Sequence, residues 1–163
     1  MNLKNFIEIL GCNASNEKVQ GILKTLNLST PVLDKGEETA WFEIEDSGYD
    51  LAFKDEASIN NDKYADIGDG ELIFMTAYFN KPDKIILPYM IKSDDTYETI
   101  VSKIGRIEDD DYVLLHEKSW LFKTDNRLEY ILFFTFSKDY SSIKKLGVIY
   151  SYGQLDWVKD LQS

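Results

Sequence analysis

Apolar residues recur at helical spacing in two stretches of the chain that lie about 78 residues apart. In each stretch the apolar positions fall at i, i+3, i+4 and i+7, which is one face of an α-helix. They are Val19, Ile22, Leu23 and Leu26 in the first stretch and Tyr97, Ile100, Val101 and Ile104 in the second. Each stretch therefore predicts an amphipathic helix, and a shorter helix is predicted at residues 2–10, where Gly11 stops it.

Both longer helices carry signals for their ends. Ser15 or Asn16 can cap the first helix. Asp95 stands at the start of the second, with Glu98 three residues later, which is the spacing of a capping box. Gly105 follows at the position where a helix commonly ends in a left-handed residue.

Alternation of apolar and polar residues after each helix predicts strands. Residues 71–79 and 128–137 are apolar on both faces, which is typical of central strands. Pro88 confines residues 85–89 to an edge or a connection, and the polar segment 55–70 is the longest predicted loop. The remaining predictions are strands at 39–45, 49–54, 119–123 and 146–152, and a last helical turn at 154–161.

These elements predict an α+β fold. Two tandem helix–β–β–β units would form a mainly antiparallel sheet with helices packed on one face, plus an extra N-terminal helix. The length fits a single domain, residues 1–163, with pseudo-repeat halves at 12–82 and 83–153. An open sheet face rich in Tyr and Phe would suit protein binding. The alternative, expected for most of these aromatic residues, is that they form the core beneath the helices.

Acidic residues outnumber basic ones, and the formal net charge is −11. This charge argues against a nucleic-acid partner, because such binding relies on Lys and Arg neutralising phosphates. It would steer a basic protein partner toward the surface, or it serves only to keep the protein soluble and monomeric. Glu108, Asp109, Asp110 and Asp111 form a run of four acids that can mimic phosphates to a basic partner. With the adjacent Tyr112, they are the candidate partner-binding residues.

The residues that usually carry catalysis or bind metals are sparse. His116 is the only histidine, so no Ser-His-Asp or Cys-His pair can be argued, and it is interpreted as a surface residue at a strand end. Cys12 lies at a helix end, and no zinc-ligand spacing occurs. The segment Asp66–Glu71 lacks the register of an EF-hand and is interpreted as a solvated turn. No catalytic, cofactor-binding or metal-ligating residue is predicted. A pair of carboxylates acting in hydrolysis stays open, since 29 acids offer many pairings.

The order of short motifs resembles a known group of proteins. A short helix is followed by Gly11-Cys12-Asn13, a helix with Val-x-x-Ile-Leu, Trp-Phe-Glu-Ile, Gly-Tyr-Asp-Leu-Ala-Phe, then Leu87-Pro88-Tyr89-Met90 and Ile104-Gly105. This order resembles small bacterial immunity proteins of polymorphic and contact-dependent toxin systems. The doubled layout is similar to the beta-lactamase inhibitor protein and to BamE-like architecture. Met90 stands where the related pattern has glycine, and Arg106 where it has proline. The resemblance implies a binding protein.

The lone cysteine fits a reducing compartment. Ile9-Leu10-Gly11-Cys12 looks like a lipoprotein cleavage site, but Asn5 and Glu8 interrupt the apolar segment that such a signal needs. The longest apolar run, residues 130–134, is too short to span a bilayer. We therefore expect a cytoplasmic protein with no membrane contact, a monomer or weak dimer. The resemblance, together with the net charge and the absence of catalytic motifs, implies that it neutralises a cognate basic, nuclease-type toxin. The alternatives are a small carboxylate-based hydrolase and an envelope assembly module of the BamE type.

Overall fold

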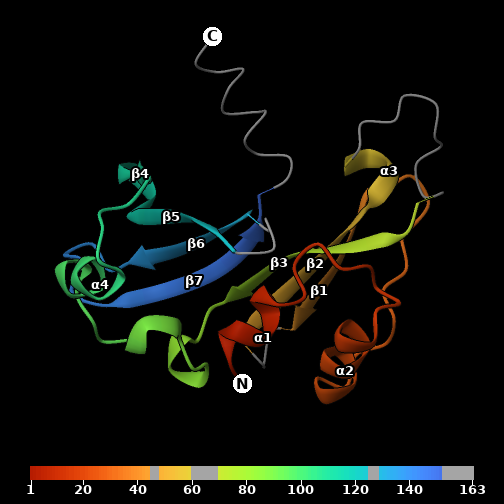
Figure 1. Ribbon diagram of the computed structural model, residues 1–163, viewed down its shortest axis with the longest axis horizontal. Coiled ribbons are helices and arrows are strands. Elements are labelled where there is room, and N and C mark those ends of the chain that lie inside the picture. The colour runs from red at the N-terminus through yellow and green to blue at the C-terminus, as the bar shows by residue number, and fades with distance from the viewer. Residues whose placement is uncertain (45–47, 60–69, 125–128, 152–163) are drawn as a thin grey trace, which may run out of the picture.

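The computed structural model describes residues 1–44, 48–59, 70–124 and 129–151. Within these ranges the chain forms a seven-stranded sheet with the order β1-β2-β3-β7-β6-β5-β4 (Figure 1). Every neighbouring pair of strands is antiparallel. The strands are β1 (Thr39–Ile44), β2 (Tyr49–Asp55), β3 (Leu72–Phe79), β4 (Asp110–Tyr112), β5 (Glu117–Lys123), β6 (Glu129–Phe136) and β7 (Ile143–Tyr150).

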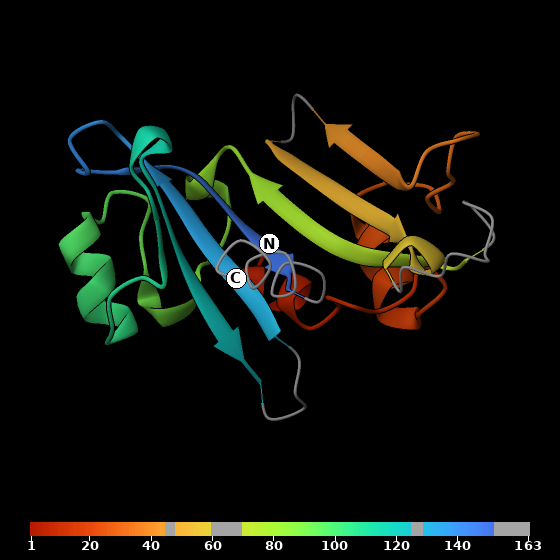
Figure 2. The ribbon, with the colours of Figure 1, turned by 90° about the horizontal axis from the view of Figure 1, so that it is seen from above.

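The sheet consists of two three-stranded meanders joined side by side. β1, β2 and β3 form the first, β5, β6 and β7 form the second, and β3 pairs with β7 from Thr76↔Ile149 to Phe79↔Leu146. The short strand β4 extends the second meander at its outer edge. Seen from above, the strands sweep across the molecule as one twisted sheet (Figure 2). The predicted α+β class is confirmed, while the interpretation of the halves as repeated units stays a prediction.

The helices with apolar stripes cover one side of the sheet. In Figure 1, α1 and α2 lie below the strands and α4 lies at the left-hand end, beside β6 and β7. The helices are α1 (Leu3–Ile7), α2 (Glu17–Thr25), α3 (Glu56–Ile59) and α4 (Tyr97–Ile104), and the single-turn 3-10 helices are η1 (Pro82–Lys84), η2 (Pro88–Met90) and η3 (Val113–Leu115). None of the helices in the described ranges has the length and apolarity needed to cross a bilayer.

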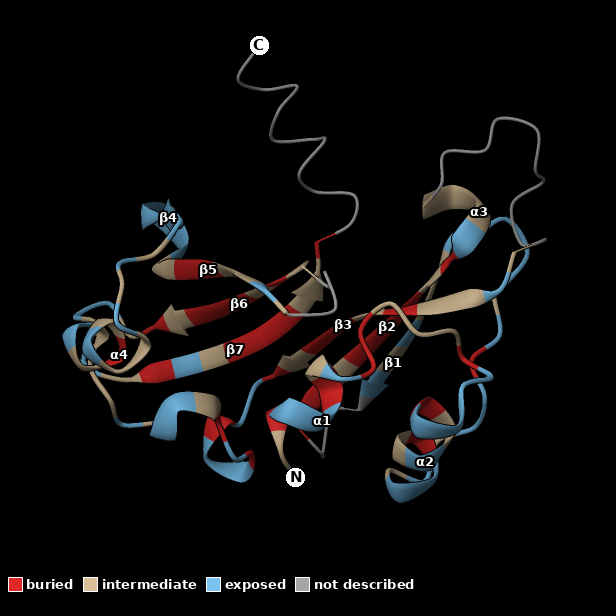
Figure 3. Ribbon diagram, viewed as in Figure 1, coloured by how far each residue is buried: buried red, intermediate tan, exposed pale blue. Residues whose placement is uncertain are grey.

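The core lies between these helices and the sheet (Figure 3). The helices contribute Leu3, Phe6, Val19, Leu23 and Ile100, and the strands contribute Phe53, Phe74, Trp120, Leu132, Phe134, Leu146 and Val148. Phe74 makes edge contacts with Phe53 at 5.1 Å between ring centroids. Most of the described aromatic residues lie in or against this core, as expected.

The cap predicted for the first long helix is confirmed. The Asn16 side chain accepts a hydrogen bond from the backbone N–H of Lys18 at the start of α2. At the end of α4, Gly105 has φ +84°, the left-handed conformation predicted for it. Glycine adopts this conformation without the steric penalty that a Cβ brings.

The cap predicted for the second long helix is wrong by one residue. Thr96 is the N-cap of α4, and its hydroxyl accepts a hydrogen bond from the backbone N–H of Thr99. The Asp95 carboxylate instead accepts from the backbone N–H of Lys92 and pairs with Lys103. A carboxylate held by a lysine of the last helical turn is not free to reach the first turn, and the next residue supplies the cap.

Three other segments differ from the sequence-based expectation. Residues 110–112, where no strand was predicted, form the edge strand β4 because they pair with the start of β5. Residues 56–59 of the predicted long loop form α3, and the rest of that loop up to residue 69 lies outside the described residues, as does the predicted turn at 154–161. Residues 88–90 turn through η2, where Met90 has φ +54°. This is the position where the related pattern has glycine, which tolerates such a φ.

Candidate partner-binding surface

The face of the sheet away from α1 and α2 carries two rows of side chains that run across the strands. Residues directly opposite each other in antiparallel pairs point to the same face, so the registers define each row. The first row is Trp41, Ala52, Thr76, Ile149, Ile131 and Leu121. The second row is Glu43, Asp50, Tyr78, Gly147, Phe133, Ser119 and Asp110. The surface is thus apolar in the middle and acidic at both ends of the second row.

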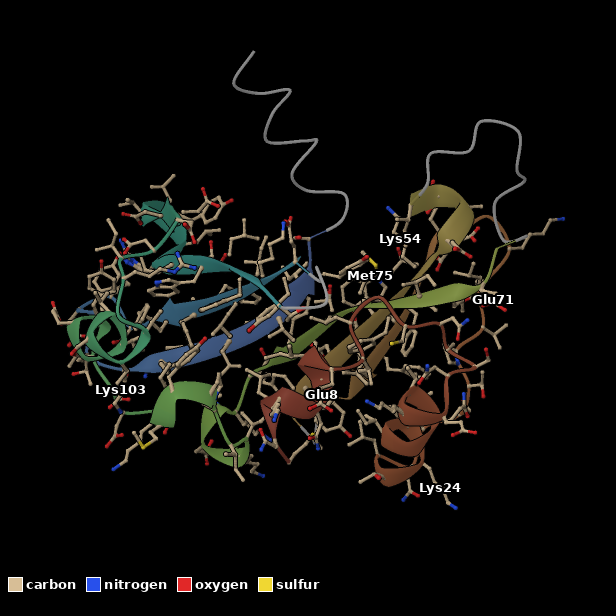
Figure 4. All side chains as sticks on the ribbon, in the orientation of Figure 1. Glu8, Lys24, Lys54, Glu71, Met75 and Lys103 are labelled. Carbon is tan, nitrogen blue, oxygen red and sulfur yellow. The ribbon has the colours of Figure 1, made fainter. Side chains whose placement is uncertain are left out.

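These rows form the floor of a groove of about 590 Å³, which we call the open-face groove. Its lining includes Trp41, Tyr78, Ile131, Phe133 and Ile149. Figure 4 shows Lys54 and Met75, two further lining residues, on the upper side of the sheet, and Glu8 and Lys24 on the helix side. Apolar concave surfaces with a few polar groups are the usual form of a binding site.

An aromatic chain forms the centre of the groove. The ring of Trp41 stacks on Tyr78, with centroids 6.1 Å apart, and Tyr78 contacts the edge of Phe133 at 5.5 Å. Gly147 lies in the same row between Tyr78 and Phe133, and a Cβ there would come within 2.5 Å of the Phe133 ring. The missing side chain therefore lets the two rings meet. Trp41, at the outer end, is 51% exposed.

A second apolar feature stands at the rim of the groove. Tyr112, Val113, Leu114 and Leu115 are consecutive, and their side chains are between 49% and 94% exposed. We call these four residues the apolar knuckle. Consecutive exposed apolar residues are uncommon on a folded surface unless they serve a function. Tyr112 also lines the groove, so the knuckle and the groove form one surface.

Of the predicted site residues, Glu108 and Asp111 are engaged in an internal ion pair. Both contact Lys118 Nζ, Glu108 Oε1 at 3.0 Å and Asp111 Oδ2 at 2.6 Å. The Lys118 side chain is only 9% exposed, and its ammonium lies over the rings of Tyr97 and Tyr140 at 5.1 and 5.5 Å. Two of the four acids therefore pair with a buried cation, although the Asp111 side chain is 39% exposed.

The other two acids differ from each other. Asp109 pairs with Arg106 at 2.6 Å and accepts a hydrogen bond from the backbone N–H of Leu121. Asp110 is exposed, lines the groove, and makes no ion pair among the described residues. Asp109, Asp110 and Tyr112 thus line the groove, whereas Glu108 and Asp111 are not among its lining residues. The sequence patterns did not indicate Trp41 or residues 113–115 as site residues; three apolar residues in a row after the acids were the available signal for the latter.

The ion network shifts the pKa values of its members. A hydrogen bond to Glu108, together with burial, raises the pKa of Tyr97 to about 12. Burial alone would raise the pKa of Glu108, but hydrogen bonds from Tyr97 and Lys118 and the lysine charge outweigh it and lower that pKa. Burial likewise works against the charged form of Lys118, but Asp111 and Glu108 outweigh it and raise the lysine pKa.

These shifts predict a pH dependence of stability. Because the pKa of Glu108 is lowered by folding, its contribution is present above the pKa of the unfolded carboxyl and is lost as the pH falls through the folded value. The pKa values of Lys118 and Tyr97 are raised, so their contributions are present below the unfolded values and are lost as the pH rises through the folded ones. We expect Glu108→Gln to lose stability at neutral pH and to converge with the wild type in acid. Urea unfolding at several pH values measures this, and a constant difference down to acid pH would contradict it.

Glu117 is a half-buried acid that lines the groove. Burial raises its pKa, although a hydrogen bond from Thr135 and the charge of Lys145 act in the opposite direction. The ammonium of Lys145 lies 4.5 Å from the centroid of the Tyr78 ring. A lysine of the protein itself thus lies over one of the aromatic rings that line the groove.

The remaining candidates for chemistry occupy structural positions. His116 has φ +51° just before β5 and contacts the ring of Tyr140, and its Nδ1 is buried without a hydrogen-bond partner among the described residues. Cys12 is a half-buried free thiol. No cluster of three metal-ligating side chains occurs in the described part of the chain, and residues 66–69 of the turn considered for calcium lie outside it.

Comparison with protein-family models, curated proteins and solved structures gives no match to this chain.

Proposed function

We propose that this protein is a non-catalytic protein-binding inhibitor, a cytoplasmic immunity protein that neutralises a cognate basic toxin of the nuclease type. The observation that carries the proposal is the continuous apolar surface formed by the open-face groove and the apolar knuckle. Exposed aromatic anchors in a depression, next to a protruding apolar turn, are the features that dominate protein–protein binding energy.

Electrostatics support a basic partner. The net charge of −11 steers a basic protein toward the chain. At the groove itself the exposed carboxylate of Asp110 is free of internal ion pairs among the described residues. Because Glu108 and Asp111 pair with Lys118, part of the negative charge of the acidic run is neutralised within the protein. We therefore propose that the apolar contacts provide most of the affinity and that the net charge mainly raises the association rate.

Co-purification with the products of neighbouring genes tests the proposal. The tagged full chain is expected to retain a stoichiometric basic partner in high salt, and that partner is expected to be toxic when expressed alone. Recovery of no partner, or of one that is harmless alone, would count against immunity function.

Two variants locate the binding surface. We expect Trp41→Ala and Leu114→Asp each to weaken the complex by about 2 kcal/mol, the size of an interface hot spot. Val32→Asp is the matched control, because Val32 is also a highly exposed aliphatic residue and lies outside the groove lining. Isothermal titration calorimetry with the captured partner measures the three affinities. Val32→Asp is expected to leave the affinity unchanged. Wild-type affinity in Trp41→Ala and Leu114→Asp, or an equal loss in Val32→Asp, would contradict binding at this surface.

A carboxylate hydrolase is the second candidate, favoured by Glu117 alone. A general acid needs a raised pKa and a second carboxylate across the substrate, and Glu117 meets the first condition within the groove. Activity against a panel of ester and glycoside substrates that disappears in Glu117→Gln would establish it in place of the binding function.

A further inference from the structure

The two edge strands of the sheet each carry an aromatic side chain and a carboxylate two residues apart. On β1, Trp41 and Glu43 are two residues apart and therefore point to the same face. On β4, Asp110 and Tyr112 have the same spacing, and both line the open-face groove. Each edge of the sheet thus presents a half-exposed aromatic ring and an exposed carboxylate on the open face, although Glu43 itself is not among the residues that line the groove.

Both carboxylates are available to a ligand. Neither Glu43 nor Asp110 makes an ion pair among the described residues, whereas Glu108, Asp109 and Asp111 all do. An aromatic face beside a carboxylate suits an arginine, whose guanidinium stacks on the ring while its N–H groups donate to the carboxylate.

The centre of the groove shows how the protein holds a cation of its own. Lys145 lies over the Tyr78 ring, with Glu117 close enough to interact electrostatically with it. The rest of the centre, including Ile131, Ile149 and Phe133, is apolar. Among the described residues, a cation lies over the ring of Tyr78 but over neither Trp41 nor Tyr112. Lys54, which lines the groove, pairs with Glu38 at 3.8 Å.

We infer that the segment seated in the open-face groove is apolar in its middle and carries one arginine at each end, one stacked on Trp41 beside Glu43 and one on Tyr112 beside Asp110. The inference rests on the proposed binding function and names the chemistry of the partner. Six strand spacings separate β1 from β4. At about 4.8 Å per spacing, the distance from β1 to β4 across the strands is roughly 29 Å. A helix of about 20 residues covers that length.

A displayed library of random 20-residue peptides, selected on the full-length protein, tests the inference before the natural partner is identified. Selected peptides are expected to have apolar centres and arginine near both ends. Glu43→Gln and Asp110→Asn should each weaken the best peptide about tenfold, the loss typical of one charged contact. Glu98→Gln, which removes an exposed charge on α4 outside the groove lining, should leave the affinity unchanged.

A charge exchange provides the confirmation. A peptide with glutamate in place of the arginine at the β4 end should bind the wild type poorly and regain affinity for Asp110→Lys. Failure to select any peptide, selection of peptides without basic ends, or binding to Glu43→Gln and Asp110→Asn as tight as to the wild type would overturn the inference. A captured natural partner that binds Glu43→Gln and Asp110→Asn as tightly as wild type would overturn the inference alone, whereas the absence of any captured partner would remove the proposed function.

Discussion

Replacing Lys118 with methionine is expected to lower the free energy of unfolding by about 3 kcal/mol, since removing one partner of a buried ion pair leaves the other charge uncompensated. Lys118 Nζ is held between Glu108 and Asp111 and lies over two tyrosine rings. Without it, the buried Glu108 carboxylate retains the hydrogen bond from Tyr97 but loses the positive charge that balances it. Urea unfolding followed by circular dichroism at neutral pH measures the loss.

The matched control is Lys123→Met. Lys123 pairs with Glu129 at 2.7 Å on neighbouring strands, but its side chain is largely exposed, and such surface pairs contribute about 0–1 kcal/mol. The double variant Lys118→Met/Glu108→Gln should recover part of the loss, because the unpaired charge is then gone as well. Equal losses of unfolding free energy in the two lysine variants would show that the Lys118 ion pairs contribute no more to stability than an exposed pair.

Replacing Gly147 with alanine is expected to destabilise the protein by about 2–3 kcal/mol, the upper part of the range for overpacking. The added Cβ would lie 2.5 Å from the Phe133 ring and 2.7 Å from the carbonyl oxygen of Ala77. The ring can move only by losing its contact with Tyr78, and the carbonyl belongs to the neighbouring strand β3. Differential scanning calorimetry should show a lower Tm.

Gly21→Ala on α2 is the control for the substitution itself. A Cβ at Gly21 meets nothing within 4 Å, and the residue lies inside a helix. Alanine there should stabilise the protein by about 0.5–1 kcal/mol. A Gly147→Ala protein that is as stable as wild type would mean that the groove floor adapts, and the contact between Tyr78 and Phe133 would then not be fixed.

Local patterns predicted the elements that depend on local physics. Alternation located β1 and β2, apolar runs located β3 and β6, and the polar side chain of Asn16 and the glycine at 105 marked two helix ends. The choice between Asp95 and Thr96 as a cap failed because it depends on Lys103, which lies two turns along the helix. The residue type and its sequence neighbours do not show which distant side chain a carboxylate will pair with.

The candidate site was predictable only in part. Asp110 and Tyr112 follow from the sequence as an acidic and aromatic stretch, and the structure brings both to the groove. The pairing of Glu108 and Asp111 with Lys118 depends on how β4 and β5 align. The two rows across the sheet require the strand order, and no local pattern specifies that β3 pairs with β7.

The junction between β3 and β7 also has a consequence for folding kinetics. Its first pair, Thr76 and Ile149, is 73 residues apart in sequence, whereas the pairings on either side begin much closer in sequence, at Asp55↔Leu72 and Phe136↔Ile143. Closing so long a loop costs conformational entropy before the contacts that offset this cost have formed, and such non-local pairing slows folding. Each meander can form early from its own hairpins, and docking of the two is then the late step. The complete groove floor therefore exists only once that last step has taken place.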